Sequence, residues 1–202
     1  MIRQMVKRVT GAVPARPPID GLEQPGVFFL RTIGDGFALR DYLAEEHPAS
    51  AVVVGGGHIG LEMTEALLRR GIEVTLVEYL PLVLTMVDAP LRNLIEEALT
   101  GRGATVVTGV SVSSIDRRDQ HLLVAGSEGF RAKAELVLVA PGARPSADLA
   151  STAGVETRQR DAIRVNRRME KNVPGVYAAG DCVETYHRLL GAQMGGHRTG
   201  SV

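Results

Sequence analysis

The sequence predicts an α/β fold, with a Rossmann-like parallel sheet, an antiparallel β-meander and part of a second domain. Three observations predict it. First, a buried strand beginning at Ala51 runs into a glycine-rich turn and a helix, and the next strand ends in the carboxylate of Glu78. Second, residues 110–139 contain short strand-like runs separated by turn residues. Third, the strand-like runs after residue 145 have no helices of ordinary length between them, as in a fragment of another sheet.

The first thirty residues are not expected to begin an independent domain. Residues 9–21 are rich in proline and glycine, which favour extended and turn conformations over helix. A short helix is expected over residues 39–46, after the turn at 34–36 and before Pro48.

The central strand-helix-strand unit begins at Ala51. The helix after the glycine turn has apolar residues at the spacing of a buried stripe, and it ends at Gly71 after two arginines. The second strand covers residues 74–77. The expected apolar stripe of the helix consists of Ile59, Met63, Ala66 and Leu67.

The elements after Glu78 follow from the same rules. Pro81 indicates a loop, a helix is expected over residues 89–102, and the β-branched run at 104–108 predicts a third strand. The apolar face of that helix consists of Leu91, Leu94, Ile95, Ala98 and Leu99.

The remaining strands are expected to form two groups. A meander would replace a crossover helix on one face of the parallel sheet, and two short strands would belong to a second sheet. The meander strands are predicted at 110–116, 121–125, 129–132 and 136–139, and the other two at 163–166 and 176–181.

Three glycines in the turn remove side chains where a dinucleotide site requires it. Gly55 lets the chain turn sharply, Gly57 lets a pyrophosphate approach the backbone, and Gly60 lets the helix pack closely on the sheet. The free N–H groups and positive dipole end of the helix would bind the pyrophosphate without a lysine. A strand before the turn and a helix after it make a nucleotide site the better interpretation than a plain strand-turn-helix unit.

Glu78 predicts which nucleotide is bound. It lies 23 residues after Gly55, close to the roughly 20 expected for the acid that bonds a ribose 2′-hydroxyl. Because a carboxylate would repel a 2′-phosphate, the sequence favours NAD over NADP.

Bulk composition excludes several classes of partner. The 23 basic residues balance the 23 acidic residues, so no nucleic-acid or anionic membrane partner is expected. The single cysteine excludes an internal disulfide and fits a reducing cytosol, and no apolar run is long enough for a membrane span. We therefore expect a cytoplasmic protein. The five histidines lack metal-ligand spacing, so no metal is assigned.

Besides the glycine turn, three motifs occur along the chain: residues 9–14 (VTGAVP), 140–145 (APGARP) and 173–182 (VPGVYAAGDC). In this order they resemble the pyridine nucleotide-disulfide oxidoreductase family. Residues 55–63 and 181–191 are most similar to its coenzyme A-disulfide reductase and NADH oxidase branch.

The resemblance implies an NAD(H) domain inserted into an FAD domain. Residues 1–20 would end the first FAD-domain segment, residues 21–144 would bind NAD(H), and residues 145–202 would be a partial second FAD-domain segment. A complete member also has an earlier G-x-G-x-x-G motif, a redox cysteine and a C-terminal dimerisation domain, which this chain lacks. We therefore expect a truncated or partial protein, whose partners would be the missing FAD-domain polypeptide or a second copy in a homodimer.

The resemblance adds residues to the expected site, and each has a simpler alternative. Glu62 would lie beside the nicotinamide, or would only complement the helix dipole. His58 stands where the branch carries a tyrosine over the flavin, or is an exposed loop residue.

Two residues of the flavin motif, Asp181 and Cys182, also have a functional and a simpler structural interpretation. Asp181 would bind the ribityl chain of FAD, or would cap a helix, and Cys182 is better explained as a small buried residue than as a catalytic one. The expected cofactor-binding residues are Gly55, Gly57, His58, Ile59, Gly60, Glu62, Glu78, Gly142, Gly180 and Asp181.

Two functions are compatible with these features. The chain would be the NADH-binding part of an FAD-dependent oxidoreductase, in which hydride passes from NADH to the flavin and electrons then reach a disulfide or oxygen. Alternatively, it would be a catalytically inactive NAD-binding module. A short-chain dehydrogenase is disfavoured because none of the four tyrosines is followed by a lysine at the fourth position.

Overall fold

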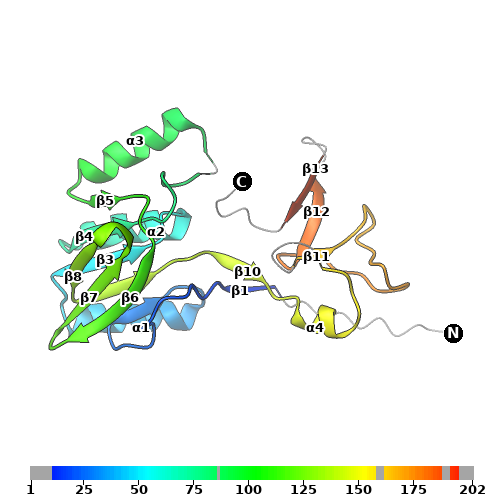
Figure 1. The fold of residues 1–202 in the computed structure, drawn as a ribbon, viewed down its shortest axis with the longest axis horizontal. Helices are drawn as coiled ribbons and strands as arrows, with labels where there is room; N and C mark the ends of the chain where they lie inside the picture. Colours follow the sequence, from blue (N-terminus) through cyan, green and yellow to red (C-terminus); the bar gives the residue numbers. More distant parts are fainter. Residues whose placement is uncertain (1–10, 86, 158–161, 188–191, 196–202) are drawn as a thin grey trace. The chain divides into compact units, whose positions relative to one another are not determined.

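The structure is a computed structural model that describes residues 11–85, 87–157, 162–187 and 192–195 (Figure 1). The chain divides into two compact units, which are described separately. The larger unit covers Arg16–Gly142, and the smaller contains residues 11–15 and the described residues from Ala143 onward. The expectations for residues 9 and 10 and for residues 188–191 lie outside the described ranges.

The larger unit is built around a five-stranded parallel sheet (Figure 1). All neighbouring strands in it are parallel. This confirms the expected α/β fold with a parallel sheet. In spatial order its strands are β2 (Val27–Phe29), β9 (Leu136–Val139), β3 (Ser50–Val54), β4 (Glu73–Val77) and β5 (Thr105–Val107).

Helices cover one face of this sheet and the meander covers the other. The helices are α1 (Ile33–Glu45), α2 (His58–Leu68) and α3 (Ala89–Thr100). The meander is an antiparallel sheet of β6 (Val112–Arg118), β7 (His121–Gly126) and β8 (Arg131–Ala134), with the 3₁₀ turn η1 (Ser127–Gly129) before β8. A meander in place of a crossover helix is therefore confirmed.

Two hydrophobic clusters show how the sheet is buried on both faces. Successive strand residues alternate between them because side chains of a strand point to opposite faces. Ala51, Val53, Val74, Leu76, Leu136 and Leu138 pack with Leu39, Leu61, Leu67 and Leu99 of the helices. Val52, Val77, Val137 and Val139 pack with Val112, Ile115, Leu122, Val124 and Ala134 of the meander.

The prediction that residues 136–139 form a fourth meander strand is wrong. They form β9, which pairs in parallel with β2 and β3 in the main sheet. All four of its side chains are fully buried, because one pair faces the helices and the other pair faces the meander. An uninterrupted apolar run is typical of a parallel strand covered on both sides.

Helix α1 begins earlier than the predicted residue 39. Thr32 is its N-cap, and its hydroxyl accepts a hydrogen bond from the Asp35 N–H at 3.1 Å. The Asp35 carboxylate in turn accepts one from the Thr32 N–H at 2.7 Å. This capping box satisfies orphan donors at the helix end, so the helix includes Gly34 and Gly36, which we predicted to form a turn.

The predicted apolar face of the third helix is only partly buried. Leu99 is buried and Ile95 is partly buried, but Leu91 and Leu94 are 50% and 61% exposed. The helix presents its C-terminal half to the core, which the apolar spacing alone does not reveal.

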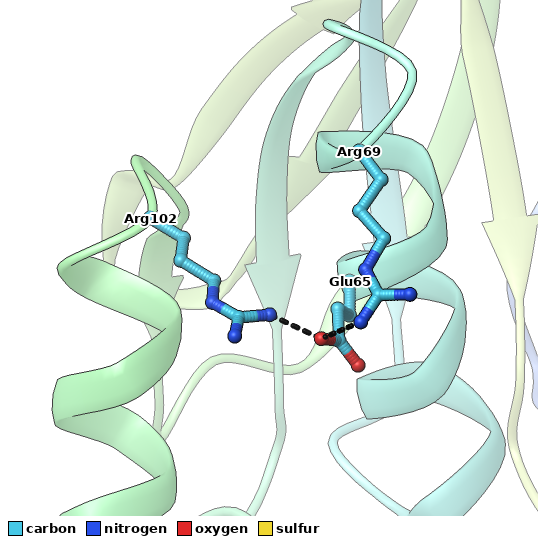
Figure 2. Close-up of polar contacts among 3 residues, drawn as sticks. All are labelled: Glu65, Arg69 and Arg102. Atoms are coloured by element: carbon cyan, nitrogen blue, oxygen red, sulfur yellow. Dashed lines mark hydrogen bonds and ion pairs between the residues drawn. The ribbon is translucent and has the colours of Figure 1, made fainter.

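An ion-pair cluster joins α2 to the turn that follows α3 (Figure 2). Glu65 bonds Arg69 one helical turn away at 2.9 Å, and the same carboxylate oxygen bonds Arg102. Arg102, the largest cause, and Arg69 both lower the pKa of Glu65. The group is exposed, so we regard the cluster as a link between neighbouring helices and not as a main source of stability.

The smaller unit contains two small sheets. Strands β1 (Ala12–Pro14) and β10 (Ala143–Pro145) are antiparallel, and the short helix α4 (Asp148–Thr152) follows them. In the second sheet, β12 (Val183–His187) pairs in parallel with β11 (Ile163–Arg164) and antiparallel with β13 (Ala192–Gly195).

The predicted strand at residues 176–181 is wrong. It contributes a single bridge, between Tyr177 and Glu170, and the strand begins only at Val183. Gly180 has a positive φ of 96° and its carbonyl accepts the Val183 N–H at 3.1 Å, so the chain turns where we expected it to extend.

None of the helices α1 to α4 in the described residues is long and apolar enough to cross a membrane.

We expect the capping box of α1 to contribute stability only above acidic pH. The Thr32 N–H is the largest cause that lowers the pKa of Asp35 below its usual value. Because the folded-state pKa lies below the unfolded one, this contribution is complete above the unfolded pKa of about 4 and is lost as pH falls through the lower folded value.

Urea unfolding of Asp35→Asn and wild type at about pH 6 and about pH 3 would measure this effect. The difference between the two proteins should shrink at the lower pH. Asp41→Asn is a matched control, because Asp41 lies on the same helix but pairs with the exposed Arg40 at 2.6 Å. A difference that stays constant with pH for Asp35→Asn would contradict the prediction.

Candidate functional site

The turn after β3 requires glycine at its first position. Gly55 has a positive φ of 112°, and a Cβ there would lie 2.4 Å from the carbonyl oxygen of Ala140. Its N–H donates to the carbonyl of Val77 at the end of β4 (2.8 Å). The turn is therefore fastened to the neighbouring strand and leaves the sheet at a point where no side chain would fit.

Gly60 and Gly57 differ in what surrounds them. A Cβ at Gly60 would lie 1.8 Å from the carbonyl oxygen of Gly55, so α2 rests directly on the turn. A Cβ at Gly57 would meet none of the described atoms within 4 Å. Gly60 is therefore closed in by protein packing, whereas Gly57 is open to a group that approaches the backbone.

The N-terminus of α2 is the natural anion-binding end of this region. Gly57 is the N-cap and provides no side-chain cap. The N–H groups of His58, Ile59 and Gly60 begin the helix and have no acceptor within it. Together with the positive end of the helix dipole, they form a cradle suited to a phosphate.

Glu78 lies against the glycine turn. The parallel register pairs Val54 with Val77, so the residues that follow them, Gly55 and Glu78, leave the sheet side by side. The carboxylate of Glu78 accepts hydrogen bonds from the N–H of Gly56 and, at 2.9 Å, from that of Leu80. The side chain is 7% exposed. The structure thus brings a carboxylate to the edge of the anion cradle.

The predicted buried stripe of α2 is confirmed for Leu67, which is buried, and for Met63, which packs against the core, but it is wrong for Ile59 and Ala66. Ile59 is 40% exposed, and Ala66 is exposed as well. The face toward the sheet consists of Gly60, Leu61, Thr64 and Leu67. The helix rotates this way because the close contact of Gly60 with the turn fixes which side meets the sheet.

His58 and Glu62 are exposed on the first turns of α2, close in sequence to the cradle. With Ile59 they remain available to a ligand in front of the helix.

The flavin-motif residues belong to the smaller unit. Gly180 and Asp181 form an exposed turn there. Cys182 is 3% exposed, and its thiol donates to the Ala179 carbonyl at 3.6 Å. Gly142, which has a positive φ of 79°, ends the larger unit. The turn glycines and Glu78 therefore lie together in the larger unit, whereas Asp181 belongs to the smaller unit.

Sequence reasoning did not assign a role to Gly56. Its N–H bonds Glu78, its carbonyl accepts the Leu84 N–H at 2.9 Å, and a Cβ there would lie 2.9 Å from Val83. The available signal was a fourth glycine, at a position where the dinucleotide motif allows any residue. Among the described residues, no group of three histidine, cysteine, aspartate or glutamate side chains could hold a metal ion.

Comparisons with known proteins agree with the motifs. The model of the family described as pyridine nucleotide-disulphide oxidoreductase matches residues 9–196. A Methanocaldococcus jannaschii protein named NADH oxidase is 37% identical over 183 residues, which is 90% of this chain and 40% of that protein. The Pyrococcus furiosus NAD(P)H sulfur oxidoreductase (CoA-dependent) is 35% identical over 185 residues, 91% of this chain and 41% of that protein.

A solved structure shows the same architecture. Reduced CoADR-RHD from Bacillus anthracis superposes with a TM-score of 0.84 and 31% identity, over 91% of this chain and 33% of that chain. The chain spans 40% and 41% of the length of the two curated relatives above.

We expect Gly60→Ala to lower the free energy of unfolding by about 2 kcal/mol, because the new Cβ would overlap the Gly55 carbonyl and force α2 off the turn. Gly36→Ala is the matched control, since the atom nearest to its Cβ is a Leu30 methyl at 3.9 Å. Alanine is favoured in helices, so the control should gain up to about 1 kcal/mol. Chemical denaturation measures both, and equal stabilities would contradict the close-packing argument.

Proposed function

The chain belongs to the pyridine nucleotide-disulphide oxidoreductase family, and from this premise we propose that its larger unit binds NADH across the glycine turn. The pyrophosphate would lie at the N-terminus of α2, against the open side of Gly57. The adenosine ribose would lie beside Glu78.

The observation that carries this proposal is the position of the Glu78 carboxylate at the edge of the cradle. Each of its oxygens accepts one backbone N–H, and a carboxylate oxygen has two lone pairs. Acceptor capacity therefore remains for a ribose 2′-hydroxyl. A 2′-phosphate would place negative charge beside the carboxylate, which supports NADH over NADPH.

Members of the family use FAD as well as NAD(P)H. When both are bound, NADH supplies a hydride and FAD accepts it. In this chain, His58 and Glu62 would lie at the nicotinamide end, and Asp181 would contact the ribityl chain of FAD. Gly142 and Gly180 would also belong to the cofactor-binding residues. Most of the FAD contacts would come from polypeptide outside this chain, or from a partner copy.

The names of the relatives indicate the class of final electron acceptor. One is an NADH oxidase and the other a CoA-dependent NAD(P)H sulfur oxidoreductase. By this likeness, the electrons that leave the flavin of the whole protein would reduce oxygen or a sulfur compound.

A second candidate is nucleotide binding without turnover. The observation that favours it is the state of the only cysteine of the chain. Cys182 is buried and its thiol bonds a backbone carbonyl, whereas a redox-active cysteine needs exposure and thiolate character. Electron transfer beyond the flavin would then depend on a cysteine that this chain does not contain.

Calorimetric titration of the chain with NADH and NADPH tests binding directly. We expect NADH to bind more tightly, by about tenfold or more, because only NADH gains a bond to Glu78 without charge repulsion. Binding of neither nucleotide would overturn the proposal. If NADH binds, the rate of NADH oxidation after addition of FAD separates the two candidate functions. Oxidation would favour the oxidoreductase, and its absence would favour binding without turnover.

The variant Glu78→Arg tests the assigned role of the carboxylate. We expect NADH affinity to fall by about tenfold and the preference over NADPH to shrink, since the acceptor is lost and a cation is introduced. Glu73→Arg is the matched control, because Glu73 is an exposed residue at the start of the same strand. Unchanged affinity of Glu78→Arg for both nucleotides would exclude Glu78 from the site.

A further inference from the structure

The glycine turn is held from one side by the segment between β4 and α3. The Glu78 carboxylate accepts the N–H of Gly56, and the Leu84 N–H donates to the carbonyl of Gly56 at 2.9 Å. These two groups belong to the consecutive peptide units that flank Gly56. The side chain of Val83, which is 1% exposed, fills the space beside it.

We propose that Glu78 is a positioning residue for the anion cradle, in addition to its role toward the ribose. This inference rests on the proposed nucleotide-binding function. By holding the Gly56 N–H, the carboxylate orients the peptide between Gly55 and Gly56, and the Leu84 N–H holds the next peptide, which leads into Gly57 and the first turn of α2. The cradle is then formed before a pyrophosphate arrives, so less ordering is needed on binding.

The contacts of the turn show why this role belongs to Glu78. Gly55 is tied to Val77 by a backbone bond, but the next N–H, that of Gly56, bonds a side chain. Without that carboxylate, a largely buried donor would lose its acceptor. The absence of a Cβ at Gly56 is part of the arrangement, because such an atom would lie 3.1 Å from the carboxylate oxygen.

A positioning role and simple charge repulsion predict opposite changes in anion affinity when the Glu78 carboxylate is removed. A carboxylate repels a nearby phosphate, so its removal should strengthen binding of an anion that makes no bond to it. If the carboxylate shapes the cradle, its removal should weaken binding of the same anion. The pair ADP and 2′-deoxy-ADP separates the roles, because only ADP has the ribose 2′-hydroxyl.

The experiment measures dissociation constants of ADP and 2′-deoxy-ADP for wild type, Glu78→Ala and Glu78→Gln by calorimetry. We expect both variants to lose the wild-type preference for ADP. We also expect Glu78→Ala to bind 2′-deoxy-ADP about fivefold more weakly than wild type, with Glu78→Gln between them because its amide oxygen can still accept one N–H. Unchanged or tighter binding of 2′-deoxy-ADP by Glu78→Ala would overturn the positioning role.

Two controls keep the outcome interpretable. Leu99→Ala removes a buried side chain at the C-terminal end of α3, away from the turn, and should lower thermal stability without changing the affinity for 2′-deoxy-ADP. Wild type that binds neither ADP nor NADH would contradict the proposed function itself. Wild type that binds ADP, with variants that lose only the effect of the 2′-hydroxyl, would leave that function intact and remove the inference.

Discussion

The contact between Gly60 and the carbonyl of Gly55 is the constraint on which the geometry of the glycine turn and the first turn of α2 depends. It leaves no room for a side chain, so α2 rests directly on the turn that precedes it. This contact fixes which side of α2 meets the sheet, and it exposes His58, Ile59 and Glu62. It also directs the free N–H groups of the first helical turn to one place in front of the sheet.

The parallel register adds a charged group to this place. Because Val54 lies opposite Val77, the chain leaves β3 and β4 at the same edge, and Glu78 reaches the backbone of the turn. A shift of one residue in that register would turn the strand residues to the opposite face. Side chains of β3, β4 and β9 alternate between the cluster that packs on the helices and the cluster that packs on the meander. This alternation fixes the register, and therefore the position of Glu78 beside the turn.

The residues that we propose to bind the nucleotide thus lie within one unit, whereas Asp181, which we assign to the flavin, belongs to the other. The turn, the helix and the carboxylate all lie within the stretch from Ser50 to Leu84, which includes both strands. Asp181 and Cys182 lie in the smaller unit, with its own small core around Val165 and Val183. The chain spans about two fifths of the curated relatives compared, 40% of one and 41% of the other.

The sequence by itself determined the glycine turn, the helix after it, the strand before Glu78 and the three strands of the meander, because each has a local signal in residue type or spacing. Tertiary structure decided the strand pairing, the buried side of the helix and the long-range hydrogen bonds, which local spacing cannot predict. Strand β9 joined the parallel sheet, since pairing partners are chosen by contacts far apart in sequence. Helix α2 turned its Gly60 side inward, and the Gly56 N–H found the Glu78 carboxylate 22 residues away. Such contacts depend on register and close packing in three dimensions, which no periodicity along the chain encodes.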